Sequence, residues 1–140
     1  MNAHRFPIRI YYEDTDAGGV VYHANYLRFA ERARTEALRE AGAPHSELVE
    51  LHGLMFMVRR VKMDYLAPAR IDDSLTILTT PTLIRGASLD LRQSVLRGDT
   101  IVAEIDIQVV CVHAATGKPG RIPPRWRKAL AYRRAEHEES

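Results

Sequence analysis

The order of the periodic segments limits the folds open to this chain more than any other feature of its sequence. Residues 24–41 have a helical period, and four successive runs with strand character follow them without a second long helix in between. A doubly wound parallel sheet needs helices that alternate with its strands, so this order argues against it. The pattern predicts an α+β architecture in which one antiparallel-rich sheet packs on one central helix.

The helix at 24–41 is predicted from apolar residues spaced by three or four. They form one alanine-rich stripe, which lets the helix lie close to its neighbour: Tyr26, Ala30, Ala33, Ala37 and Ala41, with Leu27 and Leu38 beside them. Most charged residues, Arg34 among them, fall on the other faces. Gly42 and Pro44 end the helix, and Asn25 is the nearest N-cap candidate.

Five runs are predicted as strands: 6–12, 56–66, 73–84, 87–97 and 100–113. The run 87–97 alternates cleanly, 100–113 also alternates, and Gly98-Asp99 between them is a hairpin turn signal. Pro81 predicts a bend or a sheet edge, and residues 123–134 are predicted as a short final helix. Because one long helix covers only part of such a sheet, we expect the opposite sheet face to need a partner subunit.

Composition limits the classes of function. The 140 residues suit one domain over 1–140, and we expect roughly the last ten residues to be a poorly ordered tail. Twenty basic residues against 18 acidic ones leave a net charge of +2, which gives no argument for nucleic acid binding. Cys111 is the single cysteine, and no apolar run approaches the roughly 18 residues that span a bilayer. We therefore expect a cytoplasmic protein with no nucleic acid partner and no transmembrane segment.

The candidate chemistry lies in residues 11–36, YYEDTDAGGVVYHANYLRFAERARTE. Asp14 and Asp16 precede Gly18-Gly19, and His23 stands just before the expected helix. A helix N-terminus leaves backbone N–H groups unpaired, and these donors can stabilise an oxyanion on a carbonyl. A nearby aspartate can attack that carbonyl or activate water. This arrangement indicates acyl transfer without a Ser–His pair, although both aspartates could instead only satisfy turn amides.

Other kinds of site fit less well. A calcium loop that began at Asp14 would place Asn25 where a bidentate Glu is needed. The nucleophile loop of haloacid-dehalogenase-like phosphatases needs Thr or Val where Gly18 stands, and the sequence has no phosphate-binding glycine loop and no G-x-S-x-G elbow. Cys111 falls on the apolar face of its strand, and the histidines lack zinc-ligand spacing. We expect no metal site.

The stretch 11–36 resembles the 4-hydroxybenzoyl-CoA thioesterase family of hotdog-fold acyl-CoA thioesterases, and within it the YbgC-type branch associated with the Tol-Pal system. The pattern D-x-D-x-x-G-x-V-x-x-x-x-Y is matched by Asp14, Asp16, Gly19, Val21 and Tyr26. The segments VKMDYLAPARIDDSL, RGASLDLRQ, AEIDIQVVCVH and GKPGRIP extend the similarity over nearly the whole chain. The resemblance implies a hotdog fold, an antiparallel sheet wrapped around one long central helix.

The resemblance also implies roles for single residues. Asp16 would be the nucleophile or general base, and the His23 amide would polarise the thioester carbonyl, with the His23 side chain as a second catalytic candidate. Gly19, Val21 and Tyr26 would contact the substrate. His23-Ala24 favours the YbgC-like branch, because the aromatic subgroup tends to have Tyr-Pro there.

The phosphates of CoA require basic residues at the mouth of the pocket. The first candidates are Arg85, with Gly86 and Ser88 beside it. Weaker candidates are Arg59, Arg60, Lys62, Lys118, Arg121 and Arg125.

The expected protein is an acyl-CoA thioesterase that releases free acid and CoA and needs no cofactor besides the CoA of its substrate. We expect a homo-oligomer, a dimer or a homotetramer, and an acyl carrier protein is a second candidate partner. A non-catalytic acyl-CoA or acyl-carrier-protein binding protein is the alternative in another class. A hotdog hydratase is the other enzyme alternative, but its Asp–His motif is not found here.

Overall fold

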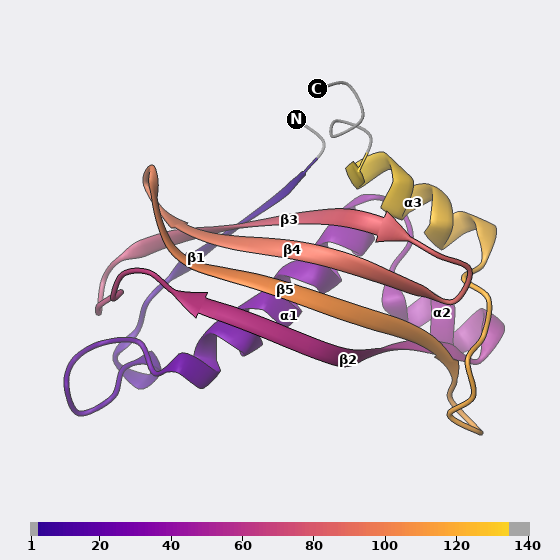
Figure 1. Cartoon of the computed structure of the whole chain (residues 1–140), viewed down its shortest axis with the longest axis horizontal. Coiled ribbons are helices and arrows are strands. Elements are labelled where there is room, and N and C mark those ends of the chain that lie inside the picture. The colour runs from indigo at the N-terminus through magenta and orange to yellow at the C-terminus, as the bar shows by residue number, and fades with distance from the viewer. Residues whose placement is uncertain (1–2, 135–140) are drawn as a thin grey trace.

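A computed structural model describes residues 3–134. Its elements, in chain order, are β1 (His4–Arg9), the short 3-10 turn η1 (Tyr12–Asp14), α1 (His23–Glu40), α2 (His45–His52), β2 (Leu54–Tyr65), β3 (Ser74–Ile84), β4 (Ser88–Arg97), β5 (Thr100–His113) and α3 (Pro124–Arg134). Figure 1 shows the sheet in front and α1 running along its rear face.

The strands form one antiparallel five-stranded sheet in the order β1-β3-β4-β5-β2. β1 is short and pairs with β3 only as far as Thr79. Pro81 lies just beyond this point, at a register shift between β3 and β4, which confirms the bend or edge predicted there. β2 is the other edge of the sheet, and its outer side has no neighbouring strand among residues 3–134.

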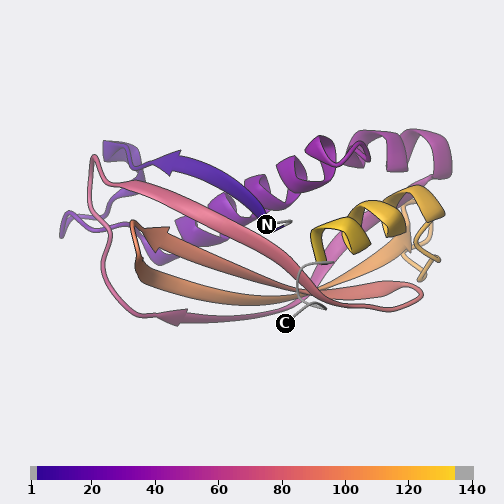
Figure 2. The same cartoon turned by 90° about the horizontal axis from the view of Figure 1, so that it is seen from above.

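α1 packs on the concave side of the sheet, and β1 curls toward it (Figure 2). Ala30 and Ala33 are fully buried, so the backbone of α1 can approach the sheet closely. Tyr26 and Phe29 are also buried and meet edge to face, with their ring centroids 6.2 Å apart. Burial of a side chain such as Phe29 contributes roughly 1.5–3 kcal/mol to folding. The sheet wrapped around one long helix is the α+β hotdog fold that the sequence predicted.

The start and the buried stripe of α1 differ in detail from the prediction. Tyr22, in an extended conformation, is the N-cap, and Asn25 lies within the first turn. The side-chain amide of Asn25 instead donates to the Asp14 carbonyl at 2.9 Å. Phe29 belongs to the core, whereas Leu27 is exposed. A stripe defined by alanine spacing did not show which flanking residue points inward.

Three other segments also differ from the prediction. The first strand covers His4–Arg9 rather than 6–12, because the chain turns into η1 at Tyr12. The helix α2 was not predicted; only Leu48 of its eight residues is buried, so its apolar signal is weak. Residues 131–134 of the expected tail belong to α3, and 135–140 lie outside the described residues.

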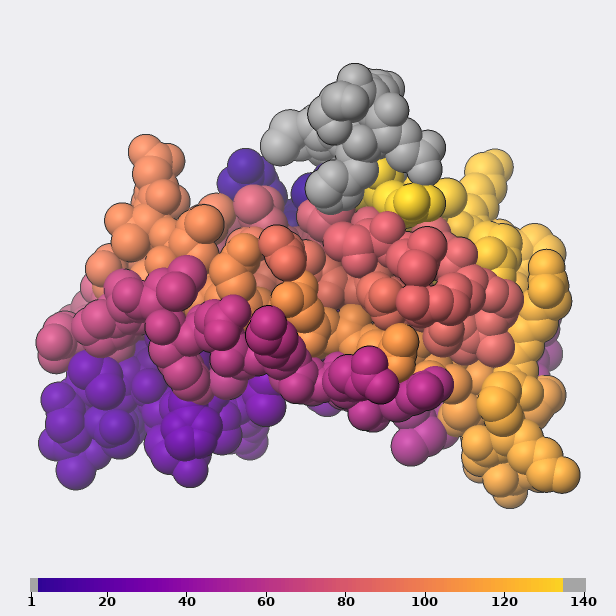
Figure 3. Space-filling view, viewed as in Figure 1, coloured from indigo at the N-terminus to yellow at the C-terminus, as the bar shows by residue number. Residues whose placement is uncertain are grey.

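The sheet face away from α1 is covered by no helix in the described part of the chain (Figure 3). It carries polar side chains from β2 to β5, such as Lys62, Thr82 and Asp106. Arg92 pairs with Asp106 at 3.0 Å, and Arg85 pairs with Asp90 at 2.9 Å. Because these charges satisfy one another, the face does not require an apolar cover. A partner subunit on this face stays a prediction.

Candidate active site

The loop between η1 and α1 closes on itself and brings Asp16 to the start of α1. The Asp16 N–H donates to the Val20 carbonyl at 2.8 Å, and the Tyr22 N–H donates to the Asp14 carbonyl at 3.1 Å. Val21 then donates to the Ala69 carbonyl at 2.8 Å, which fixes the loop to the segment between β2 and β3. The loop lies at the left of Figure 1, next to the first turn of α1.

The two glycines serve different purposes. Gly19 has φ +80°, a left-handed conformation that a residue with a side chain adopts only with strain. Gly18 has no such φ, but a Cβ there would lie 3.3 Å from Asp16 Oδ1. Gly19 therefore makes the turn, and Gly18 leaves room for the carboxylate.

The two aspartates differ in what their carboxylates do. Asp14 Oδ2 accepts the Tyr11 N–H at 2.8 Å and so holds η1 together. Asp16 Oδ1 accepts the Gly18 N–H at 2.8 Å and the Val20 N–H at 3.4 Å. Asp16 Oδ2 has no hydrogen-bond partner among residues 3–134, and the residue is exposed. One oxygen of Asp16 is therefore fixed by the loop, and the other is available for chemistry.

The first turn of α1 presents two free amide donors. The N–H groups of Tyr22 and Asn25 have backbone acceptors, whereas those of His23 and Ala24 have none in the described part of the chain. Unpaired donors of this kind carry the positive end of the helix dipole. A carbonyl oxygen placed here would accept a hydrogen bond and be polarised.

Aromatic rings surround the exposed His23 side chain. Its ring centroid lies 4.6 Å from that of Tyr22 and 6.0 Å from that of Tyr65, which ends β2. Tyr65 also lies 5.7 Å from Tyr26, centroid to centroid, and burial raises the pKa of the Tyr26 hydroxyl. Tyr26 and Val21 are both buried, so in this chain they support the loop from beneath. Their contact with substrate stays a prediction.

The structure thus groups Asp16, Gly19, Val21, His23 and Tyr26. In contrast, Arg85, Gly86 and Ser88 lie at the other end of the sheet. Val20 of the loop forms an isolated β-bridge with Arg70, which lies just before β3. Arg85 follows directly after the end of β3. The eleven residues of β3 at about 3.3 Å each separate the two ends by roughly 35 Å. Within one chain, these two groups cannot contact the same reacting centre.

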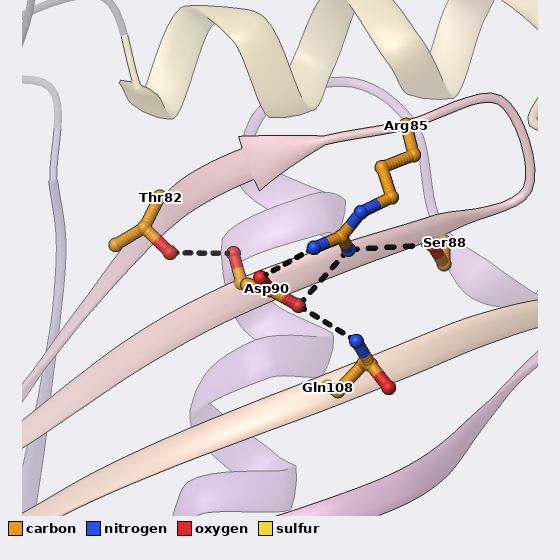
Figure 4. A network of polar contacts seen from close by, with 5 residues as sticks. All are labelled: Thr82, Arg85, Ser88, Asp90 and Gln108. Carbon is orange, nitrogen blue, oxygen red and sulfur yellow. Dashed lines mark hydrogen bonds and ion pairs between the residues drawn. The ribbon is translucent and has the colours of Figure 1, made fainter.

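Arg85 already has an anionic partner (Figure 4). Its guanidinium donates to both carboxylate oxygens of Asp90, at 3.1 and 2.9 Å, and to the Ser88 hydroxyl at 3.4 Å. The Gln108 amide donates to the same carboxylate at 3.2 Å. Arg85 holds the pKa of Asp90 below its usual range, and Asp90 raises the pKa of Arg85.

Arg121, only a weaker candidate in the sequence, lies beside the same turn. A Cβ on Gly86 would lie 3.4 Å from Arg121 Nη1, so glycine keeps this guanidinium uncrowded. The Gly86 carbonyl accepts the Ile122 N–H at 2.9 Å and Arg127 Nη2 at 3.1 Å. Arg121 itself has no hydrogen-bond acceptor or ion-pair partner among residues 3–134. The sequence does not show that the segment after β5 returns to the β3–β4 turn and places Arg121 beside Gly86.

Other kinds of site find no support in the described residues. No group of three His, Cys, Asp or Glu side chains in 3–134 is arranged to hold a metal ion. Cys111 is buried, and burial raises the pKa of its thiol, as expected for an inert cysteine. Within the same range, every helix is too short or too polar to cross a membrane.

Comparison with known proteins gives the family. A model of the thioesterase-like superfamily matches residues 11–130. The acyl-CoA thioester hydrolase YbgC of Escherichia coli O6:H1 (strain CFT073) is 47% identical over 120 residues, which cover 85% of this chain and 89% of that protein. The acyl-CoA thioesterase YbgC of Haemophilus influenzae is 41% identical over 129 residues, 92% of this chain and 95% of that protein.

Solved structures agree with this result. The crystal structure of a probable thioesterase from Bartonella henselae is 37% identical, with a TM-score of 0.81 over 86% of this chain and 99% of that one. Together with the YbgC relatives, it confirms the family and the branch expected from the sequence. The chain belongs to the thioesterase-like superfamily.

Proposed function

We propose that this chain hydrolyses acyl-CoA thioesters to free acid and CoA at the start of α1. The observation that carries the proposal is the Asp16 carboxylate, with Oδ1 fixed by the Gly18 amide and Oδ2 unengaged, next to the free amides of His23 and Ala24. A binding protein would not need this carboxylate. The relatives named acyl-CoA thioester hydrolase and acyl-CoA thioesterase support the same activity.

The chemistry follows from these groups. The thioester carbonyl oxygen accepts the His23 N–H, which stabilises the negative charge that develops during attack. Asp16 Oδ2 either attacks the carbonyl carbon or takes a proton from the water that attacks it. The C–S bond then breaks and the CoA thiolate leaves, taking up a proton. On the nucleophile route, water hydrolyses the mixed anhydride and frees Asp16.

We further propose that the active unit is a homodimer paired through β2. This edge strand is twelve residues long and exposes apolar side chains, with Met57 49%, Val58 45% and Val61 40% exposed. A long apolar edge is a template for pairing with another strand. Two copies that pair antiparallel along β2 make one continuous sheet. A homotetramer would add a second dimer, for which the polar outer face is the available surface.

The dimer explains the distance between the two groups of predicted residues. β2 begins at the end of the sheet where the β3–β4 turn lies and ends beside His23. Antiparallel pairing of two β2 strands therefore places the Arg85 end of one chain beside the Asp16 end of the other. We propose that CoA spans both chains, with its phosphates near Arg121 and Arg85 of the partner subunit. Arg121 is the stronger cation for this purpose because Asp90 already neutralises Arg85.

Thiol release from short-chain, long-chain and aromatic acyl-CoAs tests the activity, with light scattering on the same sample. We expect release from at least one substrate, and a mass twice or four times the chain mass of 15.9 kDa. Tight binding without release would instead support the non-catalytic binder. A monomer with full activity would refute the shared site. We place the protein in the cytoplasm, since its single cysteine fits a reducing compartment.

A further inference from the structure

A cavity of about 460 Å³ lies between the second half of α1 and the sheet. The ribbons of α1 and the sheet diverge along this half of the helix (Figure 2). The sheet side of the cavity is apolar, with Leu89 and Val109 in its wall, whereas α1 contributes Glu31 and Arg34. The volume is within the range of small-molecule sites. Asp16 and His23 of the same chain do not line it.

Arg34 is the unusual residue in this wall. Its Nη1 donates to Gln93 Oε1 at 3.0 Å, and the fully buried Gln93 is itself held by the Ala30 carbonyl and the Thr79 hydroxyl, both at 2.9 Å. The other nitrogens of Arg34, Nε and Nη2, have no hydrogen-bond acceptor in the described part of the chain. Burial lowers the pKa of Arg34, but a guanidinium keeps its charge in proteins. The cavity therefore contains a fixed cation with unused donors.

Other titratable groups among the described residues also face the cavity. Glu31 lies on the same helix wall, and its charge opposes the lowering of the Arg34 pKa by burial, although the two form no ion pair; Arg133 of α3 also lines the cavity. His45 is neutral, because its Nε2 accepts the Phe56 N–H at 3.1 Å and burial lowers its pKa. The unused donors of Arg34 are therefore the polar feature of this wall that a ligand can reach. An apolar chain that ends in an anion matches this lining.

We propose that the cavity receives the acyl group of a thioester held at the partner's Asp16, and that Arg34 selects acyl chains that end in a carboxylate. The inference rests on the proposed function and on the β2-paired dimer. Phe56 and Val58 line the cavity from the first half of β2, which antiparallel pairing places opposite the second half of the partner's strand. That second half ends beside the His23 ring of its own chain. The substrate class is the mono-CoA thioester of an aliphatic dicarboxylic acid.

Matched substrate pairs test the proposal. Suberoyl-CoA and octanoyl-CoA have the same carbon chain and differ in the terminal carboxylate; adipoyl with hexanoyl and sebacoyl with decanoyl repeat the comparison at other lengths. For the best pair, we expect the wild-type kcat/KM for the carboxylate substrate to equal or exceed that for the plain one. An apolar cavity without a cation would reject a carboxylate by at least ~100-fold.

Substitutions then assign the effect to Arg34. Arg34→Met should lower kcat/KM for the carboxylate substrate by at least ~30-fold and for the plain one by less than ~3-fold. Arg34→Lys keeps the charge and should retain part of the preference. Arg32→Met removes an exposed cation two residues away on α1 and should change neither rate.

The outcomes separate the two proposals. Hydrolysis of the plain substrate with strong rejection of its carboxylate partner at every length would overturn the role of Arg34 and leave the thioesterase intact. Equal losses on both substrates in Arg34→Met would show a structural role only and also overturn the inference. If Arg34→Met does not fold, the role of Arg34 is tested by Arg34→Lys and by the wild-type ratio of kcat/KM for the carboxylate substrate to kcat/KM for the plain one. A wild type that hydrolyses no acyl-CoA refutes the proposed function, and this inference with it.

Discussion

The glycine pair offers a sharp test of how the loop positions Asp16. An alanine Cβ at Gly19 meets nothing within 4 Å, so Gly19→Ala introduces only the strain of φ +80°. Gly98, in the β4–β5 turn, has φ +62° and equally open space, and it lies outside the candidate site. Gly18 differs, because its added Cβ would push on Asp16 Oδ1 from 3.3 Å.

These geometries give distinct magnitudes. An alanine in the left-handed conformation is strained by roughly 1–2 kcal/mol. Alanine also lowers the conformational entropy of the unfolded chain, which offsets part of this strain. Gly19→Ala and Gly98→Ala should therefore each lower the free energy of unfolding by about 1 kcal/mol. Gly18→Ala must displace the carboxylate by a few tenths of an ångström. Because small misplacements of a reacting group are costly, kcat/KM should fall at least ~10-fold.

Urea denaturation and thiol release on the same preparations check both effects. Gly98→Ala is the control, since it should lose stability and keep its activity. The reasoning about Gly18 fails if Gly18→Ala keeps wild-type kcat/KM while remaining folded. Wild-type stability of both Gly19→Ala and Gly98→Ala would show that the left-handed backbone at these positions does not strain an alanine.

Three further effects are expected. Gln93→Leu leaves Arg34, the Ala30 carbonyl and Thr79 without their shared partner, so the free energy of unfolding in urea should fall by about 3 kcal/mol. Burial lowers the pKa of His45 in the folded state. The stability that neutral His45 contributes is therefore complete above the unfolded pKa of ~6.5 and declines as the pH falls toward the folded pKa. His45→Gln should flatten this part of the curve of urea stability against pH. The Cys111 thiol should react with a colorimetric thiol reagent at least ~100-fold faster in denaturant than in native buffer; equal rates would contradict its burial.

The sequence was most informative where one periodic pattern determined the structure. The alternation in 100–113 predicted β5 to the residue, and residues 11–36 predicted the loop and helix start that hold Asp16 and His23. The helix α2 escaped prediction because a single buried residue, Leu48, gives no period. Short helices of this kind are stabilised by tertiary packing rather than by their own pattern.

The sequence did not predict which side chains on different elements lie beside one another. Arg85 was the first candidate for CoA binding, but the register of β4 places Asp90 against it, and only the fold brings Arg121 to the same turn. The helical period places Arg34 away from the apolar stripe, on a face expected to be solvated. The fold instead turns it toward Gln93 and the cavity.

The most direct test of the Asp16 mechanism compares Asp16→Asn with wild type in a thiol-release assay on the best acyl-CoA, with Asp99→Asn in the β4–β5 turn as the control. We expect Asp16→Asn to lower kcat by at least ~100-fold, to keep the urea midpoint and to bind the substrate still, whereas Asp99→Asn should match the wild type. A folded Asp16→Asn protein that releases thiol at the wild-type rate would contradict the assignment of this carboxylate to the reaction.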